Sequence, residues 1–144
     1  MIQHPYTAAN FLVEIDGLLL GGFSKVSGLD IETETETIQE GGVNNFTYKL
    51  PSQTSYSDLV LENGIVEYSQ LWPWYQGVVQ GRIQRRNGSI YLLNTEGNKV
   101  FWWNFLQAFP HSWKGPSFDA SQASVAIQQI SLAHHGLSEA QGRR

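Results

Sequence analysis

The sequence predicts a mainly β domain, a β-barrel or a β-sandwich with a single helix, and three observations support this. Most apolar runs are short and end at glycine, proline or asparagine, as strands bounded by turns do. One segment, which begins at Leu71, repeats its apolar residues at helical spacing. The 144 residues suit one domain with a substantial core, and no repeat or linker divides them. We therefore expect one domain over residues 1–137 and a polar tail over 138–144.

The expected strands follow one another along most of the chain. Gly28 ends the second strand, and the Gly41-Gly42 and Asn44-Asn45 pairs mark a loop after the third. Asn63-Gly64 is a typical turn signal, and residues 95–98 are expected to turn a hairpin. The strands are expected at Asn10–Asp16, Gly17–Ser27, Leu29–Gln39, Phe46–Leu50, Asp58–Glu62, Ser89–Asn94, Lys99–Asn104, Gln107–Trp113 and Ser124–His134, with the polar stretch Pro51–Ser57 and the loop Gly115–Ser121 between them.

The last expected strand changes phase along its length. Its apolar residues are Val125 and Ile127 at first, and then Ile130 and Leu132. A strict two-residue alternation cannot place all four on one face, so we predict a β-bulge near Gln128-Gln129.

The helix is predicted from an apolar stripe at Leu71, Trp74, Tyr75, Val78 and Val79. We expect Ser69 to be its N-cap. Pro73 would then fall in the first turn, where backbone N–H groups have no helical partner in any case. Gly81 is the expected stop.

The composition leaves two interpretations of the surface. Charged residues are only 15% of the chain, below the ~25% that is usual for soluble domains, whereas five Trp, six Tyr and seven Phe are present. Either another molecule, such as further copies of the chain, covers much of the outside, or a monomer buries an aromatic-rich core. Composition alone favours neither.

Several function classes are disfavoured by the sequence. The net charge of −4 and the lack of a phosphate-neutralising basic patch argue against sequence-specific nucleic-acid binding. The absence of cysteine excludes a disulfide scaffold, a thiolate metal site and a cysteine nucleophile. The start of the chain has no signal-peptide pattern, and its apolar runs are shorter than the ~20 residues of a membrane helix. We expect folding in the cytoplasm.

No catalytic or metal-binding constellation is predicted, so we expect a protein that is not an enzyme and has no cofactor. Nucleophile-elbow and phosphate-loop motifs are missing. Adjacent His134 and His135 would point to opposite faces of a strand and could not share one metal ion in the usual way.

The most informative segment alternates glutamate and threonine from Glu32 to Thr37. On a strand, the glutamates form one face and the threonines form the other, so beyond Ile31 neither face can fill a core. One interpretation is a charged edge strand that resists aggregation. The other is a strand in a sheet that continues between subunits and lines a wet channel.

A series of short motifs follows one order along the chain. The motifs are Val26–Leu29, Glu32–Glu36, Glu40–Gly42, Tyr48–Pro51, Leu59–Gly64, Leu92–Gly97, Trp103–Phe105, Ala108–Pro110, Pro116–Ala120 and Val125–Ile130. Each motif is weak alone, but their order and spacing are specific over residues 6–137. They resemble the tail-tube family of contractile-tailed bacteriophages, and especially the tube proteins of phage-derived extracellular contractile injection systems. The helix departs from the family pattern, because Trp72-Pro73-Trp74 stands where acidic or basic residues are usual.

This resemblance implies a small β-barrel of two packed antiparallel sheets with one flanking helix, a fold similar to that of the type VI secretion tube protein. It implies homohexameric rings that stack into a rigid tube inside a contractile sheath. The implied partners are the chain itself, the sheath protein, baseplate and tube-cap proteins, and protein or DNA cargo in the lumen. The particle would assemble in a prokaryotic cytoplasm and act as a phage virion or an extracellular machine that pierces a target membrane.

Two sets of residues are candidates for assembly. Glu32, Thr33, Glu34, Thr35 and Glu36 are expected to line the lumen or to pair between subunits. The loop residues Glu40, Gly41, Gly42, Asn44, Asn45 and Phe46 are expected to stack one ring on the next, because a segment rich in glycine and asparagine can conform to a neighbour. Two alternatives are a tube-initiating ring at the baseplate and a monomeric β-module that binds glycans through exposed aromatic residues.

Overall fold

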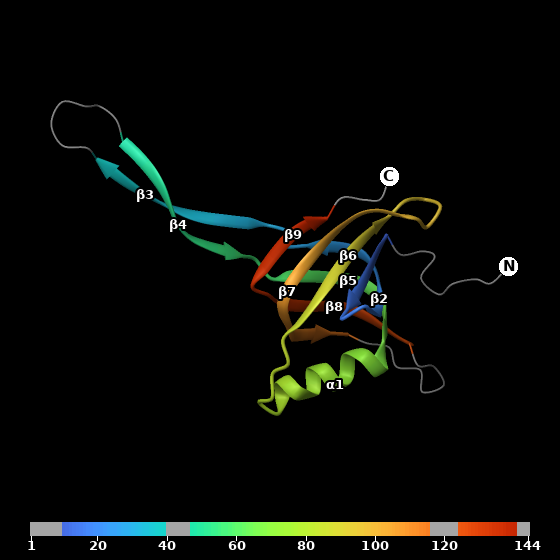
Figure 1. The fold of residues 1–144 in the computed structure, drawn as a ribbon. Helices are drawn as coiled ribbons and strands as arrows, with labels where there is room; N and C mark the ends of the chain where they lie inside the picture. The colour runs from blue at the N-terminus through green and yellow to red at the C-terminus, as the bar shows by residue number, and fades with distance from the viewer. Residues whose placement is uncertain (1–9, 40–46, 116–123, 141–144) are drawn as a thin grey trace.

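The computed structural model describes residues 10–39, 47–115 and 124–140, and within them it consists mainly of antiparallel strands with one helix (Figure 1). The mainly β class predicted from the sequence is confirmed. The elements are β1 (Phe11–Ile15), β2 (Leu18–Ser27), β3 (Ile31–Gln39), β4 (Thr47–Tyr56), β5 (Leu59–Glu67), α1 (Tyr68–Val79), β6 (Arg86–Leu93), β7 (Lys99–Lys114), β8 (Ser124–Ala133) and β9 (Gly136–Ala140).

Seven strands form one sheet, which we call the body together with α1. Their order is β6-β1-β2-β5-β8-β7-β9, and β6 pairs in addition with β7. The hydrogen-bonded neighbours therefore run from β6 through β1, β2, β5 and β8 to β7 and back to β6. Strand β7 is 16 residues long and pairs with β6, β8 and β9.

The second sheet contains only β3 and β4, and we call this ribbon the arm. Its main tertiary contacts are between its own two strands. It projects away from the body (Figure 1). The expectation of two sheets packed face to face is therefore wrong for the described residues. The physical reason lies in β3, because a strand of alternating glutamate and threonine has no apolar face to lay against another sheet.

The core lies inside the body, and β5 and β8 both contribute to it. Leu61 and Val66 of β5 both belong to this core and are fully buried, although an odd number of residues separates them and Asn63, with φ 52°, lies between them. Strand β8 changes phase in step, because Ile130 pairs with Leu61 and Val125 pairs with Val66. The register between β5 and β8 has no shift. The predicted bulge near Gln128-Gln129 is therefore wrong, and the phase changes instead where Asn63 of β5, with its positive φ, lies opposite β8 between the Glu62–Gln129 and Gly64–Ile127 pairs.

Two expected breaks are strands in the structure. The polar stretch Pro51–Ser57 was expected to connect two strands, but β4 runs through Pro51 to Tyr56. The Asn63-Gly64 signal lies inside β5, which is paired with β2 on one side and β8 on the other. Asn63 adopts φ 52°, a conformation that asparagine tolerates. Gly64 leaves room for the Phe23 ring, so its role is packing and not a turn.

The helix begins and ends close to the predicted positions, with one correction. Leu71 and Trp74 of the predicted stripe are buried and Tyr75 and Val78 are partly buried, but Val79 is 72% exposed, so the stripe ends before the last residue of the helix. Gly81 has φ 78° just after the helix, which confirms it as the stop. The N-cap is Glu67, without a side-chain capping bond, so Ser69 is not the cap and Pro73 lies beyond the first turn. Among the described residues, no helix is long and apolar enough to cross a membrane.

Candidate interaction surface

The arm is a two-stranded ribbon whose outer edges are unpaired by any strand in the described part of the chain. An isolated two-stranded ribbon is at best marginally stable in water. Unpaired edges also present free N–H and C=O groups to other chains. The arm therefore has the backbone chemistry of an incomplete sheet.

The arm has two different faces, as the sequence predicts. One of them carries glutamates near the base of the arm and apolar side chains nearer to its tip. Glu32, Glu34 and Glu36 share one face of β3, and two-residue alternation places Ile38 on that face as well. Across the ribbon, Glu36 is opposite Leu50 and Ile38 is opposite Tyr48. This face therefore carries carboxylates along most of β3 and an apolar group at the end of β3, where Ile38 and Tyr48 are paired. We call this the glutamate face.

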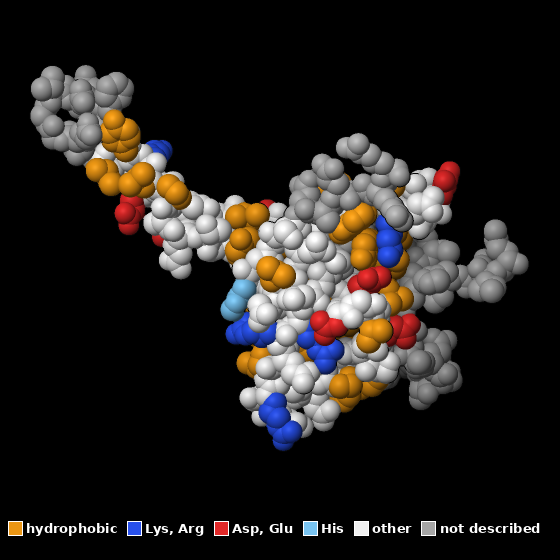
Figure 2. Space-filling model, viewed as in Figure 1, with side chains coloured by type: hydrophobic (Ala, Val, Ile, Leu, Met, Phe, Trp, Pro, Cys, Tyr) orange, Lys and Arg blue, Asp and Glu red, His pale blue; other side chains and the backbone are white. Residues whose placement is uncertain are grey.

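The apolar side chains of the arm are exposed. Ile38, Tyr48 and Leu50 show between 46% and 50% of their surface to solvent, and Ile31 on the opposite face shows 58%. Figure 2 shows hydrophobic atoms gathered along the outer part of the arm, beside acidic ones. Apolar groups gathered at an exposed site commonly mark a place of contact with another protein. Ile38 was not among the residues expected to take part in assembly, although it continues the alternation of the glutamates.

Polar contacts hold the ribbon together where it lacks a core. The hydroxyls of Thr33 and Thr54 hydrogen-bond across the strands at 3.0 Å. The Ser52 hydroxyl donates to the Glu34 carbonyl at 3.1 Å. The register shifts between Thr33 and Thr35. Such a bulge increases local twist and changes where the outer part of a ribbon points.

The base of the arm is fixed to the body by short contacts. Gly28, with φ 88°, packs so closely on the backbone of Asp58 that a side chain would not fit there. The His134 Nε2 atom hydrogen-bonds the Ser57 carbonyl at 2.9 Å, and His111 Nε2 lies 2.8 Å from an Asp58 carboxylate oxygen. These contacts set the direction in which the arm leaves the body.

The structure describes one of the two sets of residues predicted to take part in assembly, and the other set lies outside its described residues. The arm contains Glu32, Thr33, Glu34, Thr35 and Glu36, all exposed. The loop residues Glu40, Gly41, Gly42, Asn44, Asn45 and Phe46 lie outside the described residues. Within residues 10–39, 47–115 and 124–140, no three histidine or acidic side chains gather as metal ligands would.

Solved structures of contractile injection machines share this fold over nearly its whole length. The PVC sheath–tube complex of an extracellular contractile injection system, in its extended state, matches with a TM-score of 0.70 and 27% identity, over 97% of this chain and 94% of that one. The tube-terminating cap of the anti-feeding prophage matches with a TM-score of 0.68 and 26% identity, over 99% and 95%. The baseplate of the same prophage matches with a TM-score of 0.68 and 26% identity, over 97% and 98%.

The fold thus places the chain in the class of tube proteins from contractile injection systems and phage tails. No curated protein sequence matches the chain. The family model for the T4-like virus tail tube protein gp19 matches residues 7–138, and the chain belongs to that family. This confirms the resemblance inferred from the order of the motifs.

Proposed function

We propose that the protein is a structural subunit of the inner tube of a contractile injection system or phage tail. In this proposal the chain forms hexameric rings, and the rings stack into a hollow tube inside a contractile sheath. The tube carries protein or DNA cargo and is driven through a target membrane when the sheath contracts. The role is mechanical and requires no catalytic residue or cofactor.

The observation that carries the proposal is the arm. Its unpaired edges and exposed apolar side chains are unfavourable on a solitary molecule in water. Strands from neighbouring copies would pair with those edges and extend the sheet around a ring. The body, which holds the core, would keep the same fold in the free and the assembled protein.

The glutamates have two possible roles within such a ring. Glu32, Glu34 and Glu36 either contribute charge to a water-filled lumen or take part in contacts between subunits. A lumen lined with carboxylates would repel anionic cargo and limit its adhesion. The ring-stacking role of residues Glu40–Phe46 also remains a proposal, since these residues lie outside the described part of the chain.

The partners proposed for this chain follow those of its relatives. The similar structures come from a sheath–tube complex, a tube-terminating cap and a sixfold-symmetrised baseplate. We therefore assign the sheath protein, a tube cap and the baseplate as partners, and an assembled phage or extracellular particle as the site of action. The similarity to a baseplate structure also supports a second candidate, the tube-initiating ring of the same machine.

Electron microscopy of the purified protein tests the proposal, with light scattering after gel filtration to give the mass. A tube subunit should form rings of uniform diameter or long tubes, and the mass of a ring should be that of a hexamer of the 16.2 kDa chain. Rings that never lengthen unless a second tube protein is added favour the tube-initiating ring. A monomer at high concentration that binds oligosaccharides contradicts both and supports a glycan-binding module.

A further inference from the structure

The segment that follows α1 carries an unusual concentration of positive charge. Arg82, Arg85 and Arg86 occur within five residues, and no acidic residue occurs from Tyr68 to Thr95. Val79 and Ile83 beside them are exposed, Val79 to 72%. We call Val79, Arg82, Ile83 and Arg85 the basic surface. It combines cationic groups with exposed apolar ones.

Two of these three arginines have no acidic partner among the described residues. Arg82 and Arg85 form no ion pair with any described residue. Arg85 instead donates to His135 Nε2 at 3.2 Å and lies over the Phe109 ring. Arg86 does have an acidic partner, because its guanidinium lies 3.7 Å from an Asp16 carboxylate oxygen. Its side chain is also only partly exposed. Arg82 and Arg85 are therefore the cations that remain available to a partner.

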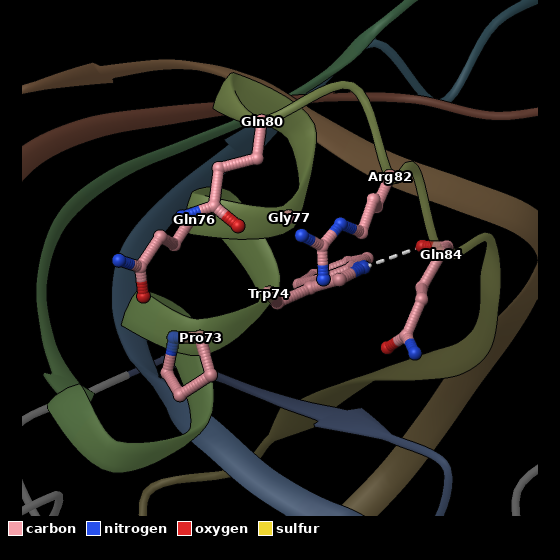
Figure 3. A pocket seen from close by; sticks show the side chains of 7 residues that line it. All are labelled: Pro73, Trp74, Gln76, Gly77, Gln80, Arg82 and Gln84. Atoms are coloured by element: carbon pink, nitrogen blue, oxygen red, sulfur yellow. Dashed lines mark hydrogen bonds between the residues drawn. The ribbon is translucent and has the colours of Figure 1, made fainter.

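A groove adjoins Arg82 and supplies further hydrogen-bond donors. Its volume is about 310 Å³, and Gln76, Gln80, Arg82 and Gln84 line it together with the buried Trp74 (Figure 3). The Trp74 indole N–H donates to the Gln84 carbonyl at 2.7 Å, which ties the two sides of the groove together. Guanidinium and amide N–H groups are donors suited to carboxylates.

The glutamate face of the arm has the complementary chemistry. Glu32, Glu34 and Glu36 are exposed and form no ion pair among the described residues. The same face continues into Ile38 and Tyr48, which are exposed apolar groups. Acidic and apolar groups on the arm thus match basic and apolar groups after α1. Such a match favours encounter and fixes the orientation of two surfaces.

The arm cannot make this contact within its own molecule, because it projects away from α1 (Figure 1). The contact must join two copies. Because the two surfaces are different, the contact is head-to-tail. When two copies bind in this way, one keeps an unoccupied glutamate face and the other keeps an unoccupied basic surface. Contacts of this kind generate closed rings or open-ended stacks.

We propose that the glutamate face of one copy docks on the basic surface of another copy. This inference rests on the proposed function and identifies the two surfaces that meet. Arg82 and Arg85 bind the carboxylates of Glu32, Glu34 and Glu36, while Ile83 and Val79 cover the apolar end of the arm. Salt should weaken this contact, because its two surfaces attract each other through opposite charges. The Debye screening length falls to about 3 Å at 1 M salt.

Charge reversal with exchange of partners tests this docking. One variant carries Arg82→Glu and Arg85→Glu, and the other carries Glu32→Lys, Glu34→Lys and Glu36→Lys. Each alone should raise the protein concentration needed for assembly by roughly tenfold or more, because like charges then face each other. An equal mixture should assemble again, since every arm then meets a surface of opposite charge on the other variant. Lys114→Glu and Glu96→Lys are matched controls with exposed charges elsewhere.

The outcomes separate this inference from the proposed function. Recovery in the mixture, with thermal melting of each variant unchanged, supports the docking. Wild-type tubes that both variants also form at the same concentration contradict the docking but leave the tube function standing. Variants that fail to assemble and are not restored by mixing also contradict it. A wild-type protein that stays monomeric contradicts both.

Discussion

The body and the arm are both built from antiparallel strands, yet their side chains differ in burial and their strand edges differ in pairing. In the body, β6 pairs with β7 as well as β1, and residues such as Leu61 and Ile130 are completely buried. In the arm, both outer edges are open, and Leu50 and Tyr48 are about half exposed. The body buries a hydrophobic core within one chain, and β6 and β7 close its run of paired strands. The described strands of the arm have no core and no further strand beside them, so the arm is the part that the proposed assembly would complete.

The largest expected effect comes from removing the arm. Replacing residues 31–56 with a short Gly-Ser linker should abolish assembly, because the unpaired strands are then lost. The free energy of unfolding should fall by less than the ~2–5 kcal/mol that loss of one large buried side chain costs, since none of the described side chains of the arm lies in the core. Electron microscopy measures the first quantity and urea denaturation measures the second. A variant that still forms tubes, or a body that no longer folds, would contradict the division into body and arm.

Matched leucine truncations in the two regions should separate stability from assembly. Leu61→Ala removes a fully buried side chain, so it should cost about 2–5 kcal/mol of unfolding free energy. Leu50→Ala removes an exposed one and should cost less than about 0.5 kcal/mol. Leu50→Ala should nevertheless weaken assembly. Chemical denaturation and light scattering check the two effects, and equal loss of stability in both variants would contradict the comparison.

A smaller effect is expected from adding a methyl group to the tight interior of the body. In Gly64→Ala the new group would meet the Phe23 ring and the Gly22 backbone, so we expect a cost of about 1–3 kcal/mol. Gly97→Ala is the control for adding the same group in open space. It has φ 83° and no neighbour near the added group, and only backbone strain of roughly 1 kcal/mol is expected. Melting temperatures that fall further for Gly97→Ala would show that the interior relaxes more easily than its packing implies.

The smallest effects should come from exposed polar pairs, and they should be equal in the two regions. Lys25 and Glu62 lie 3.6 Å apart on the body, and the Thr33 and Thr54 hydroxyls lie 3.0 Å apart on the arm. Lys25→Ala and Thr33→Ala should each change the free energy of unfolding by about 0.5 kcal/mol or less. Thermal melts of the two variants check this. A large loss in either one would mean that surface pairs, and not burial, distinguish the regions.

The sequence predicted the strands well where one local pattern dominates. Alternation identified the glutamate and threonine faces of β3, and helical spacing identified Leu71 and Trp74 as the buried residues of α1. Glycine with positive φ at residues 28 and 81 ended its element as expected. These features depend on backbone sterics and side-chain spacing. Residues close together in the sequence determine both of them.

Local patterns failed where distant strands decide the outcome. Asn63-Gly64 has the chemistry of a turn, but pairing with β2 and β8 on both sides keeps it in a strand. The phase change in β8 appeared to need a bulge, but it occurs where Asn63 of β5, far away in the sequence, lies opposite β8. The basic surface was missed for a similar reason. The sequence does hold a signal, because no acidic residue occurs from Tyr68 to Thr95, but only the fold shows that Arg82 and Arg85 form no ion pair with a described residue from elsewhere in the chain.

Strand β7 has a mechanical consequence for the body. It spans 16 residues, or roughly 50 Å of extended chain. Different parts of it hold β6, β8 and β9 in register, so none of these three can detach without breaking bonds to the same strand. A load applied to any of them is shared by the others, and the body should yield as one cooperative unit under force.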